Sequence, residues 1–138
     1  MNFKEQKIAI KKIENILSMN VRLIILDSAT SYYRYELNDD KSNIMIRREL
    51  INQINYLNML TRKYNIASII TNQVFSNINN NSIEKLKALG GTAIEHISKT
   101  ILRFEKSGIG KRTIKIIKHR SIKEGISCNF QITNNGLI

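Results

Sequence analysis

The chain is poor in the residues that build disulfides and metal centres. Its 138 residues include one cysteine, two histidines, no proline and no tryptophan. The lone Cys128 cannot form an internal disulfide, and its strand-like surroundings predict a buried structural thiol. The two histidines and the cysteine lack the spacing of a metal-ligand set. The sequence therefore argues against a disulfide framework and against a His/Cys metal centre.

Long apolar runs are absent as well. No stretch approaches the roughly 18 residues that a membrane-spanning helix requires. The first residues, Met1 to Lys12, are mixed in charge and lack the apolar core of a signal peptide. We therefore expect a soluble, cytoplasmic protein. The length, with 42% hydrophobic and 24% charged residues, predicts one globular domain that covers residues 1–138.

Positive charge is in excess. The formal net charge is +11 and the isoelectric point is about 10.0. Such a balance favours association with polyanions such as nucleic acid. The abundance of Ile, Asn and Lys is also typical of an AT-rich genome, so compositional bias is an alternative explanation of the charge.

The first half of the chain has the pattern of an α/β protein. Phe3 to Met19 reads as an amphipathic helix with Ala9, Ile13 and Ile16 at helical spacing and with Ile10 and Leu17 beside them. It would either cover a sheet or bind a partner or an anionic surface. Val21 to Leu26 predicts a strand that is buried on both faces.

A polar loop is expected from Ser28 to Asn43, and a long helix from Ile44 to Tyr64. The helix has Leu50 and Leu57 on its apolar face, together with Ile46 and Ile54. A second buried strand is expected from Ile66 to Thr71. Two strands joined by a crossover helix form a right-handed βαβ unit with parallel strands.

The second half predicts an antiparallel meander. Val74 to Ser82 reads as a loop, Ile83 to Leu89 as a short helix, and Gly90-Gly91 as the start of another helix that runs to Ser98. Three segments then alternate apolar and polar residues between turn signals. They are Thr100 to Lys106, Arg112 to Arg120 and Ser127 to Thr133.

Several motifs carry chemistry. Leu23 to Asp27 has the form of a Walker B strand, whose terminal aspartate lies where open α/β sheets bind ligands. Further motifs follow in order along the chain. They are Asp27-Ser28-Ala29-Thr30-Ser31-Tyr32-Tyr33-Arg34-Tyr35-Glu36, Thr71-Asn72-Gln73-Val74, Gly90-Gly91, His96 to Lys106, Lys118-His119-Arg120 and Phe130 to Gly136. Together they resemble the archaeal RadB-type proteins of the RecA/RadA recombinase superfamily, over nearly the whole chain.

The resemblance implies the C-terminal portion of a RecA-like P-loop ATPase core, with parallel strands and crossover helices followed by a meander. It implies ATP and Mg²⁺ as cofactors and a role in DNA repair and homologous recombination. Asp27 would be the Mg²⁺-linked carboxylate, supported by Ser28, and Gln73 would sense the γ-phosphate. Lys118 and Arg120 lie two apart on an expected strand, so both side chains should point to one face, where they would reach the phosphates held by a neighbouring protomer. His119 would point to the other face as a packed residue. Each assignment has a plain alternative. Asp27 could be a strand-end cap and Gln73 an ordinary polar residue at a strand end. Lys118 and Arg120 could form a solvated basic edge.

The resemblance also implies two DNA-binding loops. Basic residues would contact phosphates, and aromatic residues could stack on unpaired bases. The first loop spans about Tyr33 to Arg48, and the second about Phe75 to Leu89. The candidate residues are Arg34, Arg47, Arg48, Phe75, Lys85 and Lys87. Exposed loop charge without a ligand is the alternative.

One expected motif is missing. The chain contains no G-x-x-x-x-G-K-[ST] phosphate loop, and Gly108-Ile109-Gly110-Lys111 joins two predicted antiparallel strands, so it reads as a hairpin turn. We therefore expect the 138 residues alone neither to bind ATP tightly nor to hydrolyse it. A separate phosphate-loop-bearing half or other RecA-family protomers would be partners, besides DNA. The alternatives are a non-enzymatic DNA-binding or regulatory module and a fragment without independent function.

Overall fold

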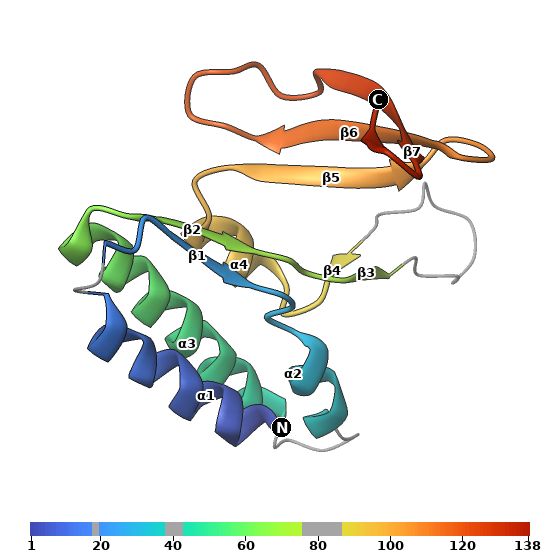
Figure 1. Cartoon of the computed structure of the whole chain (residues 1–138). Helices are drawn as coiled ribbons and strands as arrows, with labels where there is room; N and C mark the ends of the chain where they lie inside the picture. Colours follow the sequence, from blue (N-terminus) through green and yellow to red (C-terminus); the bar gives the residue numbers. More distant parts are fainter. Residues whose placement is uncertain (18–19, 38–42, 76–86) are drawn as a thin grey trace. The chain divides into compact units, whose positions relative to one another are not determined.

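The computed structural model describes residues 1–17, 20–37, 43–75 and 87–138 (Figure 1). The chain divides into two compact units, Met1–Ile97 and Ser98–Ile138. The first unit is α/β and the second is a small antiparallel sheet, in agreement with the predicted fold class. No helix within the described ranges is long and apolar enough to cross a membrane.

The first helix, α1 (Phe3–Lys12), starts at a reciprocal cap. The Asn2 side chain accepts a hydrogen bond from the Glu5 amide, and the Glu5 carboxylate accepts one from the Asn2 amide. Both donors would otherwise lack a partner at the start of a helix. The helix is followed by a 3₁₀ turn, η1 (Ile13–Ile16).

The buried face of this segment differs from the predicted one. Its buried side chains are Phe3, Gln6, Ile10 and Leu17. Ala9 and Ile16, which helical spacing assigned to the apolar face, are exposed. Gln6 replaces an apolar residue on the buried face because its amide donates to the Ala29 carbonyl at 3.2 Å and to Gln53 Oε1 at 2.9 Å. The expected apolar face was therefore wrong for Ala9 and Ile16, whereas Ile10 and Leu17 beside them are buried as expected.

A parallel strand pair forms the centre of the first unit. Strands β1 (Leu23–Leu26) and β2 (Ala67–Ile70) pair from Leu23↔Ala67 to Leu26↔Ile70. The helix α3 (Asn43–Tyr64) connects them, so the predicted βαβ unit is confirmed. Figure 1 shows α1 and α3 side by side, alongside this strand pair.

Two hydrophobic clusters hold the first unit together, and α3 contributes to both. One cluster joins Leu50 and Ile54 to α1 and to Tyr33, and the other joins Leu57 and Leu60 to β1. The predicted apolar face of α3 is confirmed, with Ile46 only partly buried. Burying such aliphatic side chains contributes about 1.5–3 kcal/mol each.

The opposite face of the strand pair is open. Ile24 is buried, whereas Leu23, Ile25 and Ile69 are 43%, 62% and 51% exposed. The prediction that β1 is buried on both faces was therefore wrong for this chain. Side chains alternate between the two faces of a strand, and only the α3-facing side is covered among the residues described.

Four shorter elements complete the first unit. The helix α2 (Ser31–Glu36) lies within the stretch predicted to be a loop, so that expectation was wrong there. Strands β3 (Val74–Phe75) and β4 (Lys87–Ala88) pair with each other, and the latter replaces the end of the predicted Ile83–Leu89 helix. The helix α4 (Thr92–Ile97) follows Gly90-Gly91 as predicted.

The second unit is the predicted meander with one additional strand. Strands β5 (Ile101–Lys106), β6 (Lys111–Lys118) and β7 (Ser127–Thr133) pair consecutively, and β8 (Gly136–Leu137) pairs with β7. The Lys111 amide donates to the Gly108 carbonyl at 3.3 Å, which confirms a turn rather than a phosphate loop.

Cys128 lies on β7 and is exposed, so the prediction of a buried thiol was wrong. Its register partner on β6 is Ile114. The same side of the sheet carries Phe104, whose ring meets that of Phe130 edge to face at 6.1 Å between centroids. Phe104 nevertheless remains 61% exposed. A four-stranded sheet of this size leaves much of its apolar face, Cys128 included, in contact with solvent.

Candidate functional site

The candidate site lies where the two parallel strands of the first unit end. Asp27 follows β1 and Thr71 follows β2, and both are exposed. The Thr71 hydroxyl donates to Asp27 Oδ1 at 2.5 Å. Backbone bonds continue the ladder here: the Thr71 amide donates to the Leu26 carbonyl and the Ala29 amide to the Thr71 carbonyl, each at 3.1 Å. The peptide bond between Asp27 and Ser28 is cis. The carboxylate is thus fixed at the ligand-binding edge of the sheet.

The segment after Asp27 is tightly packed. Ala29 and Thr30 have no exposed surface. The hydroxyls of Ser28 and Ser31 lie 2.7 Å apart and share a hydrogen bond. The Ser28 hydroxyl therefore has a polar partner on α2, and Ser28 directly follows Asp27 in the sequence.

Asn72 joins three segments of the first unit. Its side-chain oxygen accepts from the Thr30 hydroxyl at 2.8 Å, and its amide nitrogen donates to the Leu89 carbonyl at 2.8 Å. The Leu89 amide in turn donates to the Gln73 carbonyl at 3.0 Å. The side chain thus ties the segment after β1 to both sides of the β3–β4 pair. Sequence reasoning named neither Thr30 nor Asn72 as a site residue, although both lie within the quoted motifs.

Gln73 lies two residues beyond Thr71 and is exposed. Its backbone is held by Leu89, so its position is defined even though its side chain faces solvent. The carboxyl ends of parallel strands lie at one edge of a sheet, so Asp27 and Gln73 lie on the same edge. The structure therefore brings the two residues to one edge, as the phosphate-sensor interpretation requires.

The described residues of the predicted first DNA loop are largely helical. Arg34 belongs to α2, and Arg47 and Arg48 lie in the first turns of α3, all three exposed. The Arg47 guanidinium approaches Gly91 so closely that an added Cβ would lie 2.7 Å from Arg47 Nη2. Burial raises the pKa of Tyr33, and Arg47 partly opposes that shift. Arg47 is therefore packed as well as charged, whereas Arg48 lies on the exposed surface.

The second predicted DNA loop is described only at its two ends. Phe75 and Lys87 are register partners in the β3–β4 pair. Lys85 lies outside the described residues. Strand pairing therefore joins the two ends of this segment, and the Asn72 side chain binds the Leu89 carbonyl directly after the second end.

The predicted basic pair lies in the second unit. Lys118 is the last residue of β6, and Arg120 lies beyond the strand in a bend. The expectation that strand alternation points both side chains to one face was therefore wrong for Arg120. Between them, the imidazole of His119 accepts hydrogen bonds from two backbone amides. The prediction that His119 is a packed residue missed this role, for which the sequence offers no clear signal.

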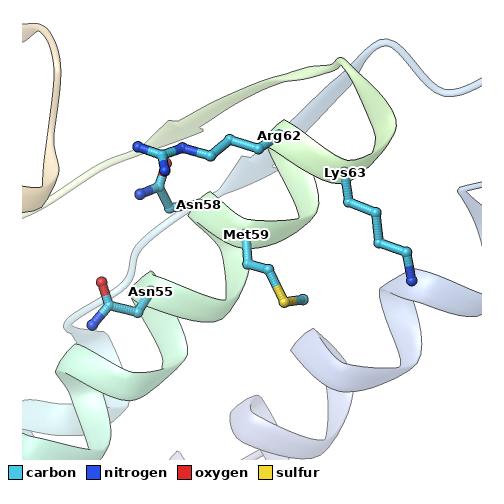
Figure 2. A pocket seen from close by; sticks show the side chains of 5 residues that line it. All are labelled: Asn55, Asn58, Met59, Arg62 and Lys63. Atoms are coloured by element: carbon cyan, nitrogen blue, oxygen red, sulfur yellow. The ribbon is translucent and has the colours of Figure 1, made fainter.

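A hollow on the outer side of α3 carries none of these residues. It is lined by Asn55, Asn58, Met59, Arg62 and Lys63 (Figure 2). Lys63 reaches toward the neighbouring helical segment, where its Nζ lies 2.7 Å from Glu14 Oε1. This surface holds α3 to η1 and has no residue predicted to act on a ligand.

The residues present fit Mg²⁺ better than they fit nucleotide phosphates. Mg²⁺ is commonly held by one or two carboxylates with water and phosphate oxygens, and Asp27 is an exposed carboxylate of this kind. No group of three His, Cys, Asp or Glu residues that could hold a metal by itself occurs in the described ranges. The glycine-rich loop that cradles phosphates is not in the sequence. These 138 residues therefore contain a carboxylate of the kind that binds Mg²⁺ but no loop of the kind that cradles phosphates.

A family model described as Rad51 matches residues 2–138, so the chain belongs to the Rad51 family. It is 53% identical, over 136 residues, to the DNA repair and recombination protein RadB of Methanococcoides burtonii. It is 42% identical to the protein of the same name from Archaeoglobus fulgidus. A solved structure, the crystal structure of the RadB recombinase, matches with a TM-score of 0.73 and 30% identity. Within the RecA superfamily, the chain is of the RadB type.

The matches cover this chain almost fully but cover its relatives only in part. The two relatives match over 99% and 98% of this chain, and over 59% and 60% of their own lengths. The solved structure is matched over 99% of this chain and 59% of its own. The chain thus spans about three fifths of the RadB proteins that it resembles.

Proposed function

We propose that this chain functions in DNA repair and homologous recombination as the part of a RadB-type protein that couples a nucleotide site to DNA. Asp27 and Ser28 contribute to a Mg²⁺ site, and Gln73 senses the γ-phosphate. The observation that carries the proposal is a pair of side-chain hydrogen bonds made by two consecutive residues, from Thr71 to Asp27 and from Asn72 to the Leu89 carbonyl. This pair runs from the carboxylate to the base of the segment proposed to bind DNA.

The nucleotide cradle must come from polypeptide other than these 138 residues. The open apolar side of the β1–β2 pair, with Ile25 62% and Ile69 51% exposed, supports such a partner. Exposed apolar faces of this kind mark surfaces where other polypeptide packs. The partner would carry a phosphate loop, either in a separate half or in another RecA-family protomer. Lys118 and Arg120 would act on phosphates held by a neighbouring protomer.

Charge supports DNA as the second partner. Nine of the 22 lysines and arginines, but only two of the 11 acidic residues, lie between Ser98 and Ile138. The second unit therefore concentrates positive charge, and the first unit adds Arg34 and Arg48 at exposed positions. Contacts between such cations and phosphates release counterions, which makes binding weaken with salt.

The test is reconstitution. The chain is mixed with a polypeptide that corresponds to the remaining part of the Methanococcoides burtonii RadB relative, and binding of a fluorescent ATP analogue is followed with Mg²⁺. We expect binding only in the mixture, weakened at least tenfold by Asp27→Asn because the carboxylate is lost. Glu5→Gln, which removes an exposed carboxylate from α1, serves as the matched control and leaves binding unchanged. Tight ATP binding by the chain alone, or equal binding with Asp27→Asn, would overturn the proposal.

A non-enzymatic DNA-binding module is the second candidate, and the charge of the second unit favours it. It predicts salt-dependent DNA binding by the chain with no restoration of ATP binding in any mixture. Fluorescence anisotropy with a labelled oligonucleotide, measured with and without the added polypeptide and ATP, separates the two functions.

A further inference from the structure

The bend that follows β6 is organised around one imidazole ring. His119 comes directly after the strand, and its Nδ1 accepts hydrogen bonds from the backbone amides of Ser121 at 3.1 Å and Ile122 at 3.0 Å. Ser121 lies two residues after His119, and Ile122 lies three residues after it. The ring therefore holds the backbone in a turn, as the side chain of aspartate or asparagine does in an Asx turn.

The base of the same loop is closed by the backbone. The Gly125 amide donates to the Ile116 carbonyl at 2.8 Å, and the Ile116 amide donates to the Ile126 carbonyl at 2.9 Å. Residues 117–124 thus form a loop with a fixed base. Within it, the two hydrogen bonds to the imidazole brace the backbone on the far side of Arg120.

The two N–H donors determine which tautomer the imidazole ring adopts. An imidazole nitrogen accepts only when it carries no proton, so Nδ1 must be unprotonated. The proton of the neutral ring then resides on Nε2. Placed between Lys118 and Arg120, His119 contributes an acceptor rather than a third positive charge when it holds the turn.

In the sequence, Arg120 lies between His119 and the two residues whose amides bind the imidazole, Ser121 and Ile122. Its backbone is therefore enclosed by the His119–Ser121 and His119–Ile122 bonds, while its side chain is exposed. Since β6 ends at Lys118, the direction of Arg120 is set by this turn and not by strand alternation. A cation that must reach a phosphate benefits from a fixed backbone, because less freedom is lost on contact.

We propose that His119 is a positioning residue for Arg120, which it holds by bonding its Nδ1 to the two amides that follow. The role of Arg120 at phosphates rests on the proposed function, whereas the turn itself does not. His119 contacts no phosphate in this assignment and acts through the backbone.

The first test uses the full chain alone. Nitrogen-15 NMR reports the tautomer of His119, and hydrogen exchange reports the amides of Ser121 and Ile122. We expect the unprotonated Nδ1 form. We also expect exchange of both amides to accelerate about fivefold in His119→Leu, roughly the factor that one hydrogen bond contributes. In the same variant, ¹⁵N relaxation should show a more mobile Arg120 amide.

A conservative variant separates the bond from the packing of the ring. His119→Asn places an oxygen close to the position of Nδ1 and forms an Asx turn readily, whereas the longer His119→Gln does not. We expect Asn to restore slow exchange at Ser121 and an ordered Arg120, and Gln to behave like Leu. Unchanged exchange in His119→Leu, or Asn and Gln behaving alike, would overturn the proposal.

The second test uses the reconstituted assembly with ATP and DNA. If His119 acts through Arg120, His119→Leu lowers kcat with little change in KM. In the double variant, His119→Leu should lower kcat no further than Arg120→Ala does alone. His119→Asn should restore the kcat of the unmodified chain. Additive effects of the two substitutions would refute action through Arg120. Absence of ATP binding in every mixture would instead refute the proposed function, while the NMR measurements still decide whether His119 holds the turn.

Discussion

The Thr30 hydroxyl donates a 2.8 Å hydrogen bond to the side-chain oxygen of Asn72, across 42 positions of sequence. Thr30 is fully buried, so this bond is shielded from water. The other end of the Asn72 amide donates to Leu89. One side chain thus connects the segment after the Walker B strand with the segment that returns from the proposed DNA loop.

Replacing Asn72 with aspartate should destabilise the first unit. The carboxylate keeps an acceptor for Thr30 but cannot donate to the Leu89 carbonyl, so a charge is placed beside an unpaired oxygen. We expect a loss of about 1–3 kcal/mol in the free energy of unfolding, measured by urea denaturation. Asn55→Asp, on the exposed side of α3, is the control and should cost less than about 0.5 kcal/mol. Equal losses for both variants would contradict the role of Asn72.

Gly90 should tolerate alanine less well than Gly110 does. Both have positive φ, +85° and +69°, which costs any L-residue about 1–2 kcal/mol. Only at Gly90 would the new Cβ meet other atoms, 2.5 Å from Ile94 Cδ1 and 3.0 Å from Leu50 Cδ2, since nothing lies within 4 Å at Gly110.

The difference between the two alanine variants therefore isolates packing. We expect Gly90→Ala to lose about 1–3 kcal/mol more than Gly110→Ala in urea denaturation, because a filled core must shift to make room. Identical losses would show that the backbone conformation alone determines the cost.

Much of this architecture was predictable from sequence, for reasons that lie in local patterns. The run from Leu23 to Leu26, the periodicity of α3 and the strand from Ala67 to Ile70 each carry their own signal. The hairpin at Gly108 was predictable because its glycines separate two alternating segments. Asp27 and Gln73 were identified through the resemblance to RadB-type proteins, and both lie shortly after parallel strands that end at a common edge.

Other features depend on contacts between distant residues. Gln6 is buried because Ala29 and Gln53 accept its amide protons, and hydropathy alone cannot identify such a partner. The short helix α2 follows Thr30 in a stretch rich in tyrosine and charge, which has the composition of a loop. The direction of Arg120 depends on where β6 ends and on the hydrogen bonds of His119. Tertiary context decides each of these outcomes.

Stability should fall in acid because of Glu14. Hydrogen bonds from Lys63 and Tyr56 lower the pKa of the Glu14 carboxyl from 4.5 to about 2, with donor distances of 2.7 Å each. A depressed carboxyl pKa contributes stability that is fully present above pH 4.5 and is lost as the pH falls toward 2.

We expect the urea midpoint to decline over this acidic range, and to decline less in Glu14→Gln, which has no charge to lose. High salt should reduce the difference because Lys63 is 57% exposed and the pair is screened. Glu5→Gln provides the control for a carboxylate outside this cluster. Parallel pH profiles for the chain and Glu14→Gln would count against the assignment.

Truncation of two neighbouring isoleucines of β1 should change the free energy of unfolding by very different amounts. Ile24 is 7% exposed and packs against α3, whereas Ile25 is 62% exposed on the open face. We expect Ile24→Ala to cost about 2–5 kcal/mol in urea denaturation and Ile25→Ala less than about 1 kcal/mol. Ile25→Ala should instead weaken reconstitution with the added polypeptide. A strong folding defect from Ile25→Ala, with reconstitution intact, would place this face in the core of the chain itself.

DNA affinity should depend on the start of α3 and not on its end. Arg48 and Arg62 are both exposed arginines of the same helix, fourteen positions apart. If Arg48 contacts a phosphate, Arg48→Ala should weaken binding of a labelled oligonucleotide and reduce the slope of log affinity against log salt by about 1. Arg62→Ala removes the same charge from the hollow on the outer side of α3 and should leave that slope unchanged. A general effect of net charge would lower affinity equally in both variants. Anisotropy titrations at several salt concentrations therefore distinguish a local contact from the overall excess of positive charge.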